Sequence, residues 1–292
     1  MAGLKITVDK SAITRRLKTL GISKKEKALY KDVATLIELD DRITRLDGNY
    51  KKHLEEVKVN MAKYKINKDE YLKIERIFLD AISERDYLSR LFDATCGKSW
   101  TRRTNWKTVA SLNKWYGVKT ACRVVRINRF MVIRMMRVVE LDLRNNYLHA
   151  HVSKGSSGVL PDDICKLEYL EKLNLGYNFI AGKLPSTLGK LCKLKVLHMH
   201  FNQLEGGLPS LNNMISLTEL YLNNNHLEGN VDELVKLRNM KTCHIYQNKF
   251  SGTVPEQLAS SKLLKAFKSY KTFLKYGPKV TARAKQEKEW HL

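Results

Sequence analysis

The stretch LYLNNNHL at residues 220–227 alternates apolar and polar side chains and then reaches an asparagine, Asn225. Such alternation predicts a strand with one buried face. The pattern recurs, with asparagine always at the sixth position, in LDLRNNYL (141–148), LNLGYNFI (173–180), LHMHFNQL (197–204) and CHIYQNKF (243–250). The intervals between these asparagines are 32, 24, 23 and 23 residues, and the asparagines are Asn146, Asn178, Asn202, Asn225 and Asn248. A period of this length predicts a stack of similar units.

Apolar residues also recur every three positions before each strand, which gives the pattern L-x-x-L-x-L-x-x-N-x-L of a leucine-rich repeat. One repeat is too small to bury its own apolar face, so neighbouring repeats must stack to build a continuous core. We expect the recurrent asparagine to turn inward and to bond backbone groups of adjacent repeats at the corner after the strand.

The segments after the strands, such as AGKLP (181–185) and SGTVP (251–255), extend the pattern until it resembles the plant-type leucine-rich repeat. LSRLFDATCGKSW (88–100) and WYGV (115–118) resemble the amino-terminal cap of receptor-like proteins of that class. The resemblance implies that tryptophans and a short helix cover the first repeat, and that the protein binds a partner. The residues it places in the cap core are Trp100, Trp106, Trp115 and Tyr116. The cap cysteines of secreted members are absent from their usual places, where Lys119 and Thr120 stand.

The predicted fold is an α/β solenoid, a curved leucine-rich-repeat array of five clear repeats with a candidate sixth, preceded by an α-helical N-terminal extension. The capping-box patterns that begin at Ser23 and Asn67 predict helices over about 24–47 and about 68–94. Residues 261–276 fit either a helix or a degenerate sixth repeat in which Thr272 takes the asparagine position. We favour the repeat, because terminal repeats are often atypical. The predicted domains are a helical extension (1–95), a basic Trp-containing cap (96–131), the repeats (132–276) and a basic, polar, extended C-terminal tail (277–292).

The chain of 292 residues has 53 Lys and Arg against 30 Asp and Glu, a net charge of +23. Residues 96–140 hold a net charge of +10 and residues 256–292 a net charge of +6, whereas residues 141–255 hold only +2. Such a surplus at the two ends suggests an acidic partner that docks there.

The stretch CRVVRINRFMVIRMMRVV (122–139) contains five arginines and no acid. The repeat register places Val132, Met135 and Val138 in the core, so we expect the arginines to project outward and to bind an anionic partner. Changing all five to glutamine should then leave stability nearly unchanged. The predicted anionic contacts are Arg102, Arg103, Lys107, Arg123, Arg126, Arg129, Arg134 and Arg137.

Alternation along the strands predicts a second surface, the concave face of the array, which we expect to bind protein. Asn174, His198, Tyr221 and His244 form one predicted column. A second predicted column comprises Arg144, His200, Asn223 and Tyr246, and Tyr177 is a further predicted contact. The H-x-H pair at His198 and His200 would need a third ligand close by to hold a metal, so we assign these rings to recognition and expect no metal site and no cofactor.

No nucleotide-binding loop, H-E-x-x-H or G-x-S-x-G pattern occurs, so we expect a scaffold and no enzyme. The leading interpretation is an intracellular scaffold whose basic ends dock onto RNA of a large ribonucleoprotein assembly such as a ribosome, while its concave face binds a neighbouring protein. One alternative is a cytoskeletal (microtubule-associated) or other protein-only scaffold on an acidic surface. A weaker alternative is a soluble receptor-like sensor.

Neither a secretory signal nor an apolar run long enough for membrane insertion is evident in the sequence. Five cysteines without C-x-x-C spacing favour reduced thiols. We therefore expect an intracellular location that is not on the secretory path, either the cytoplasm or an organelle such as the mitochondrion.

Overall fold

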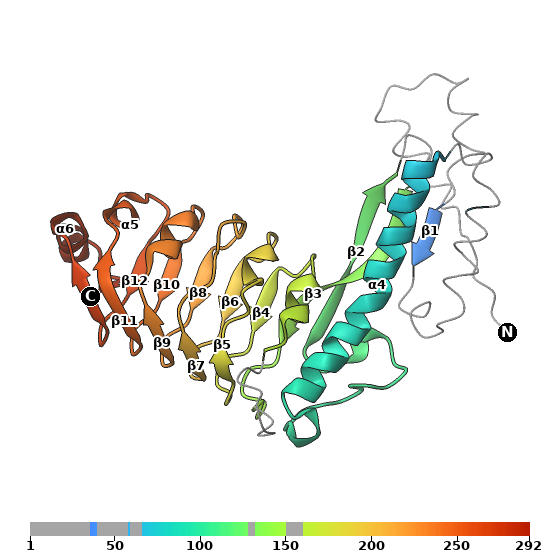
Figure 1. Ribbon diagram of the computed structural model, residues 1–292, viewed down its shortest axis with the longest axis horizontal. Helices are drawn as coiled ribbons and strands as arrows, with labels where there is room; N and C mark the ends of the chain where they lie inside the picture. Colours follow the sequence, from blue (N-terminus) through green and yellow to red (C-terminus); the bar gives the residue numbers. More distant parts are fainter. Residues whose placement is uncertain (1–35, 40–57, 59–65, 128–131, 150–159) are drawn as a thin grey trace. The chain divides into compact units, whose positions relative to one another are not determined.

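The computed structural model describes residues 36–39, 58, 66–127, 132–149 and 160–292. The chain divides into two compact units (Figure 1). One comprises residues 1–85 and 120–137, and the other comprises residues 86–119 and 138–292. We call the second one the repeat unit, because it contains all of the recurrent asparagines.

The main sheet of the repeat unit is parallel, and its strands follow one another in chain order from the end of β3 to β14. The register aligns Leu141, Leu173, Leu197, Leu220, Cys243, Phe267 and Trp290 across the sheet. The strands are β3 (Val132–Asp142), β4 (Lys172–Asn174), β6 (Val196–His198), β8 (Glu219–Tyr221), β10 (Thr242–His244), β12 (Ala266–Lys268) and β14 (Trp290–His291).

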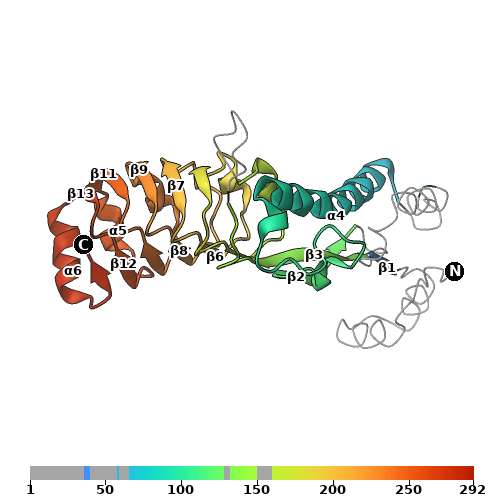
Figure 2. The ribbon, with the colours of Figure 1, turned by 90° about the horizontal axis from the view of Figure 1, so that it is seen from below.

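A second sheet forms from the segments that follow the asparagines, and Figure 2 shows it as a layer separate from the main sheet. Its strands are β5 (Ala181–Lys183), β7 (Gln203–Gly206), β9 (His226–Gly229), β11 (Lys249–Val254) and β13 (Phe273–Tyr276). Short helices precede strands of the main sheet. They are the 3₁₀ helices η4 (Asp162–Lys166), η5 (Leu188–Lys190) and η6 (Asp232–Lys236) and the α-helix α5 (Glu256–Ser260).

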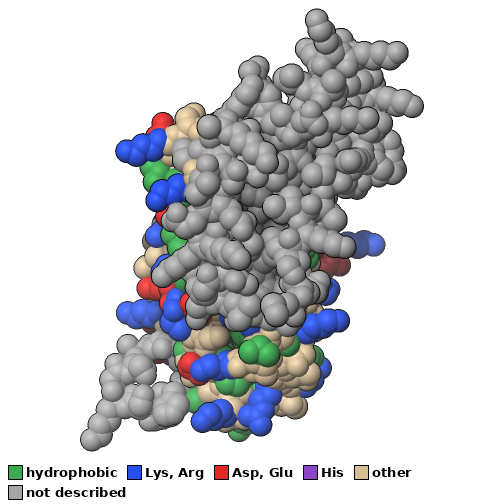
Figure 3. Space-filling view, turned by 90° about the vertical axis from the view of Figure 1, so that its right-hand side faces the viewer, with side chains coloured by type: hydrophobic (Ala, Val, Ile, Leu, Met, Phe, Trp, Pro, Cys, Tyr) green, Lys and Arg blue, Asp and Glu red, His purple; other side chains and the backbone are tan. Residues whose placement is uncertain are grey.

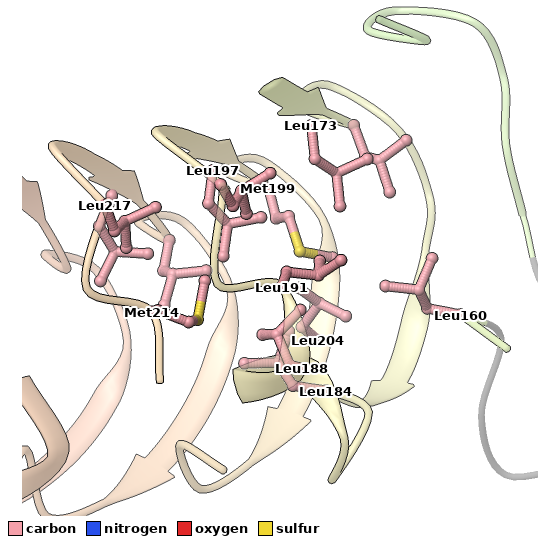
Figure 4. Packing of buried hydrophobic residues seen from close by; sticks show 14 of the residues in the cluster. Leu160, Leu173, Leu184, Leu188, Leu191, Leu197, Met199, Leu204, Met214 and Leu217 are labelled. Atoms are coloured by element: carbon pink, nitrogen blue, oxygen red, sulfur yellow. The ribbon is translucent and has the colours of Figure 1, made fainter. Parts of the chain in front are cut away.

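The space between the two sheets is filled by the apolar residues of the repeat pattern. Figure 4 shows the side chains of Leu173, Leu197 and Met199 directed inward with those of Leu188 and Leu191. Each of these five residues is at most 1% exposed. Full burial of one such side chain stabilises the fold by roughly 1.5–3 kcal/mol, so every repeat contributes through the same few positions.

The recurrent asparagines form a ladder of buried hydrogen bonds, which confirms the sequence-based expectation. Asn202 shows the arrangement: its Nδ2 donates to the carbonyls of Leu175 (3.0 Å) and Met199 (3.1 Å), and its Oδ1 accepts from the backbone N–H of Ile180 (2.9 Å). Leu175 and Ile180 belong to the preceding repeat, so the side chain joins two repeats. Asn178, Asn225 and Asn248 make equivalent bonds.

The N-terminal end of the repeat unit is closed by an aromatic cluster. Trp106 packs on Phe92, Trp100 and Trp115, with ring centroids 5.8, 4.8 and 5.0 Å apart. All four rings are buried, as the resemblance to a Trp-rich cap implies for the tryptophans. Asn146 bonds this cap, since its Oδ1 accepts from Arg102 N and its Nδ2 donates to Arg102 O. The cap contains the 3₁₀ helices η2 (Gly97–Ser99) and η3 (Leu112–Lys114).

The C-terminal end differs from the predicted extended tail. Residues 261–276 do form a repeat, with β12 and β13 in register and Thr272 Oγ1 donating to Ser269 O. Beyond it, the helix α6 (Pro278–Gln286) and strand β14 cover the last repeat, and Val280 and Trp290 are buried. The terminal repeat would otherwise expose its apolar edge. The prediction of an extended tail was therefore wrong.

The other unit contains β1 (Leu36–Leu39), most of β2 (Val118–Arg126), the first half of β3 and most of the helix α4 (Lys68–Ala94). The predicted helix over 68–94 is confirmed, and so is its capping box: Glu70 N donates to Asn67 Oδ1 and Asn67 N donates to Glu70 Oε2. The predicted helix over 24–47 is wrong at residues 36–39, which pair with β3 in parallel. Strand pairing here overrides the local helix signal.

A buried ion pair joins α4 and β3 in the same unit. Arg137 Nε lies 2.7 Å from Glu84 Oε1, and the two side chains are 2% and 1% exposed. Burying two charges is tolerated only when each satisfies the other. The pair therefore fixes which face of the helix meets the strand.

We predict that Arg137→Met lowers the free energy of unfolding of this unit by about 3–5 kcal/mol, because the buried carboxylate of Glu84 loses the guanidinium that lies 2.7 Å away. Denaturation in urea measures the loss. The double variant Arg137→Met/Glu84→Leu should recover much of it. The exposed Arg126 is the control, and Arg126→Gln should change stability by no more than about 0.5 kcal/mol. Equal small effects at both arginines would contradict a structural role for the pair.

We also predict that Asn202→Ala destabilises the repeat unit severely. Two buried carbonyls and one buried N–H would lose their partner, and each unsatisfied group costs about 1–3 kcal/mol. The exposed Asn213 offers the same substitution away from the ladder, where Asn213→Ala should stay within about 0.5 kcal/mol of wild type. Thermal denaturation of the two variants side by side checks this difference.

Candidate functional site

The solvent side of the main sheet, which lines the concave face of a leucine-rich-repeat array, carries two columns of side chains. Strand register places Asn174, His198, Tyr221 and His244 side by side, as the sequence predicts. Two positions farther along each repeat are Arg144, Gly176, His200, Asn223 and Tyr246. We call these two columns the concave face.

The rings of the first column stack on one another. The His198 and Tyr221 centroids are 4.2 Å apart at an interplanar angle of 4°, and those of Tyr221 and His244 are 4.4 Å apart at 7°. Neighbouring parallel strands lie about 4.8 Å apart, so planar side chains at equal positions are held at stacking distance. The stack gives a rigid surface of three rings.

The histidines of this surface are held in the neutral form. Burial lowers the pKa of His200 to about 4 and that of His244 to about 4. Burial also lowers the pKa of His198, although Glu219, whose Oε2 lies 3.3 Å from His198 Nε2, opposes the shift. At neutral pH the middle of the concave face therefore presents uncharged rings.

A pair of exposed aromatic rings borders the second column. Tyr177 and Phe201 are 52% and 40% exposed, and their rings stack 4.6 Å apart at 9°. His200 meets the edge of Tyr177 at 4.9 Å and also lies over Gly176, where a Cβ would come within 2.6 Å of His200 Cε1. Glycine at 176 is thus required for this packing.

Sequence reasoning identified Tyr177 as a contact but missed its partner Phe201 and a second exposed pair, Tyr147 and Phe179, whose rings meet at 5.2 Å. The available signal was positional. Tyr177 and Phe201 both immediately precede a ladder asparagine, and Tyr147 and Phe179 both immediately follow one. These four exposed rings belong to the first three repeats.

Charged groups gather at the N-terminal end of the concave face. Lys119 and Lys172 both bond Glu140, at 2.8 and 3.1 Å, and Arg144 Nη2 lies 3.4 Å from Asp142. Hydrogen bonding and attraction from the lysines lower the pKa of Glu140 although burial opposes this, so the carboxylate stays ionised. A cleft of about 470 Å³ lies among these residues. Its charges are largely compensated within the chain.

Of the predicted anionic contacts, three belong to the cap and already have partners in the chain. Arg102 donates to the carbonyls of Arg144 and Asn145 (both 3.2 Å) and stacks on Tyr116. Arg103 donates to Lys98 O, and Lys107 lies 2.9 Å from Asp93 Oδ2. These groups hold the cap together as well as adding positive charge.

The arginines of residues 122–139 do not form the expected outward row. Arg137 is buried against Glu84, so its predicted contact with an outside anion is wrong, and with it the prediction that all five arginines are dispensable for stability. The stretch holds no acid, and the partner comes from 53 residues upstream. Arg126 is exposed and Arg123 half-buried, while Arg129 and the side chain of Arg134 lie outside the described residues.

No group of three or more His, Cys, Asp or Glu side chains that could hold a metal ion occurs among the residues that the structure describes. In that part of the chain no helix combines the length and apolar character that crossing a membrane needs. In the view of Figure 3, more Lys and Arg than Asp and Glu side chains are visible on the described surface.

Several solved structures are similar to this chain. The leucine-rich-repeat ectodomain of the receptor kinase SOBIR1 from Arabidopsis thaliana is 27% identical, with a TM-score of 0.48, over 55% of this chain and 82% of that one. The BIR3–SERK2 complex from the same plant is 22% identical (TM-score 0.49; 66% and 96% covered). The PEPR1–AtPEP1 structure is 21% identical (TM-score 0.50) and covers 64% of this chain but only 25% of that chain. No curated protein matches the sequence.

The family model described as a leucine-rich repeat region matches residues 120–279, from β2 to the beginning of α6. This span is more than half of the chain and includes every repeat described above. The protein belongs to the leucine-rich repeat family.

Proposed function

We propose that the protein is a binding module without catalytic activity, and that its concave face holds a polypeptide. Leucine-rich-repeat and other solenoid proteins use their extended concave surfaces for binding. The observation that carries the proposal is the neutral stack of His198, Tyr221 and His244 with the exposed Tyr177–Phe201 pair beside it. Rigid aromatic groups that are polar at one end are enriched at protein interfaces and dominate their energetics.

The chemistry of this face favours a polypeptide over a strongly charged ligand. Because burial keeps the histidines neutral at physiological pH, the centre of the face lacks the cations that a polyanion would need. Desolvation of rings and amides is far less costly than desolvation of charges.

A second function rests on the ends of the chain. We propose that the protein docks onto an acidic ribonucleoprotein surface inside the cell, with an acidic protein polymer as the alternative partner. The net charge of +23 supports docking on an anion. The five cysteines are all free thiols, which supports a reducing, intracellular compartment.

The concave-face proposal predicts site-specific cross-linking to protein. A photoreactive phenylalanine analogue placed at Tyr246 should form adducts with a polypeptide when the full chain is irradiated in extract of its own cells. The same analogue at Ile215, an exposed position before the strand β8, is the control and should give far fewer adducts. Mass spectrometry of the adducts identifies the partner.

With that partner purified, Tyr177→Ser/Phe201→Ser should weaken binding at least about tenfold, since loss of a central aromatic anchor costs about 2 kcal/mol or more. Both rings are exposed, so the fold should survive. Adducts to RNA alone from position 246, or equal yields at the two positions, would contradict binding of a polypeptide on this face.

The buried histidines predict a specific dependence of stability on pH. His200 and His244 have pKa values of about 4 in the folded chain and about 6.5 when unfolded. The unfolded chain therefore binds more protons between these values, and the folded state loses stability as pH falls from about 6.5 to about 4. Below about 4 these two groups add no further loss.

Thermal denaturation across that range tests this assignment. His200→Gln/His244→Gln should flatten the fall in melting temperature, whereas His226→Gln, at an exposed position, should leave it unchanged. An unaltered pH profile in the double variant would show that other groups cause the dependence.

A further inference from the structure

The C-terminal cap contains an open groove of about 690 Å³ between the end of α5 and the helix α6. Its lining includes the side chains of Lys262, Lys265, Lys279 and Arg283, with Ser260 and Ser261 between them. Glu287 is the one acid in the lining. The groove therefore has four cationic groups, two hydroxyls and one carboxylate, which is the composition of an anion site.

The ion pairs of the C-terminal cap, residues 256–292, leave most of its cations uncompensated. Residues 256–292 have nine basic and three acidic side chains. Each acid already lies near a cation: Glu256 near Lys279 (3.2 Å), Glu287 near Arg283 (3.8 Å) and Glu289 near Lys268 (3.5 Å). Within the described part of the chain this leaves six exposed lysines without an ion pair, namely Lys262, Lys265, Lys271, Lys275, Lys285 and Lys288.

Arg283 forms the floor of the groove and is not available as a two-pronged ligand. Its Nη1 donates to the carbonyls of Ala259 (2.7 Å) and Ser261 (2.6 Å), its Nη2 donates to Leu264 O, and its guanidinium stacks on Trp290 at 4.6 Å. The side chain thus ties α5, the start of the last repeat and β14 together. What the groove offers to a ligand is the charge of its lysines.

A lysine ammonium acts as a point charge without the fixed fork of an arginine, and it is a common ligand of phosphate groups. An open groove lined by several lysines can bind a chain that carries one charge per unit. We propose that the C-terminal groove binds the phosphodiester backbone of single-stranded RNA.

The inference rests on the proposed docking to a ribonucleoprotein and assigns part of that docking to the C-terminal residues of the chain. It is independent of the concave face, because none of the groove residues belongs to the two columns described above. Binding should be insensitive to RNA sequence, since lysine ammonium groups contact phosphates and read no bases.

The test uses the whole chain and fluorescein-labelled oligouridylate, with fluorescence anisotropy measured over a series of salt concentrations. The variant Lys262→Gln/Lys265→Gln removes two exposed charges from the groove. Lys190→Gln/Lys249→Gln removes two exposed charges from the repeats and is the matched control. The affinity falls with salt at a logarithmic slope of about −0.7 per phosphate neutralised, so the groove variant should lose about 1.4 from that slope and the control much less. Neither pair should shift the melting temperature.

The outcomes separate the groove from the docking proposal. Equal losses in the two variants would overturn the groove while leaving RNA docking in place. An absence of RNA binding by the wild-type chain would overturn both. Vesicles of phosphatidylcholine with phosphatidylserine provide the second arm. Vesicle binding that depends on Lys262 and Lys265, without RNA binding, would overturn the assignment to RNA in favour of a lipid headgroup.

Discussion

The parallel register of the main sheet is the constraint on which the rest of the repeat unit depends. Because strands stack about 4.8 Å apart with equivalent residues side by side, each position of the repeat becomes a continuous line across the unit. The inward lines are apolar and build the core. The corner line is asparagine, whose side chain bonds a carbonyl of its own repeat and also a carbonyl and an N–H of the previous one. The outward lines carry the stacked rings.

The same constraint explains why charge collects at the ends. A charged residue repeated along one outward line would face its own kind at about 5 Å, where like charges directly opposite are destabilising. Neutral rings and amides avoid this repulsion, and Lys172 is accepted at the start of the sheet because Glu140 lies 3.1 Å away. Residues of the caps need not recur at the spacing of the repeats, so the caps can contain many cations. Some of these also stabilise the fold, as Arg283 does by bonding a backbone carbonyl.

The repeats could be predicted from the sequence because each structural role recurs with a fixed spacing. Five asparagines in one register specified the ladder, and Thr272 marked the sixth repeat although no asparagine stands there. The partners in the ion pair of Arg137 and Glu84 lie 53 residues apart, and no periodic signal links such residues. The strand β1 and the helix α6 depend on pairing or covering by distant segments, which local patterns do not encode. The concave columns were predictable, but the pairing of Tyr177 with Phe201 was not, because it depends on the backbone turn before each asparagine.

These features divide the binding chemistry between two kinds of position. Positions that recur in every repeat form a rigid, neutral surface. Their side chains can vary little, because a change on one strand alters its contact with the next strand. Positions of the C-terminal cap that occur only once supply charge without that restriction. Arg283 bonds the local carbonyls there, and Lys262 and Lys265 line the groove without an ion pair to the described residues. A partner recognised by shape on the concave face and an anion attracted to the groove would therefore bind without competing. The electrostatic contribution would weaken with salt, whereas burial of the aromatic rings would not.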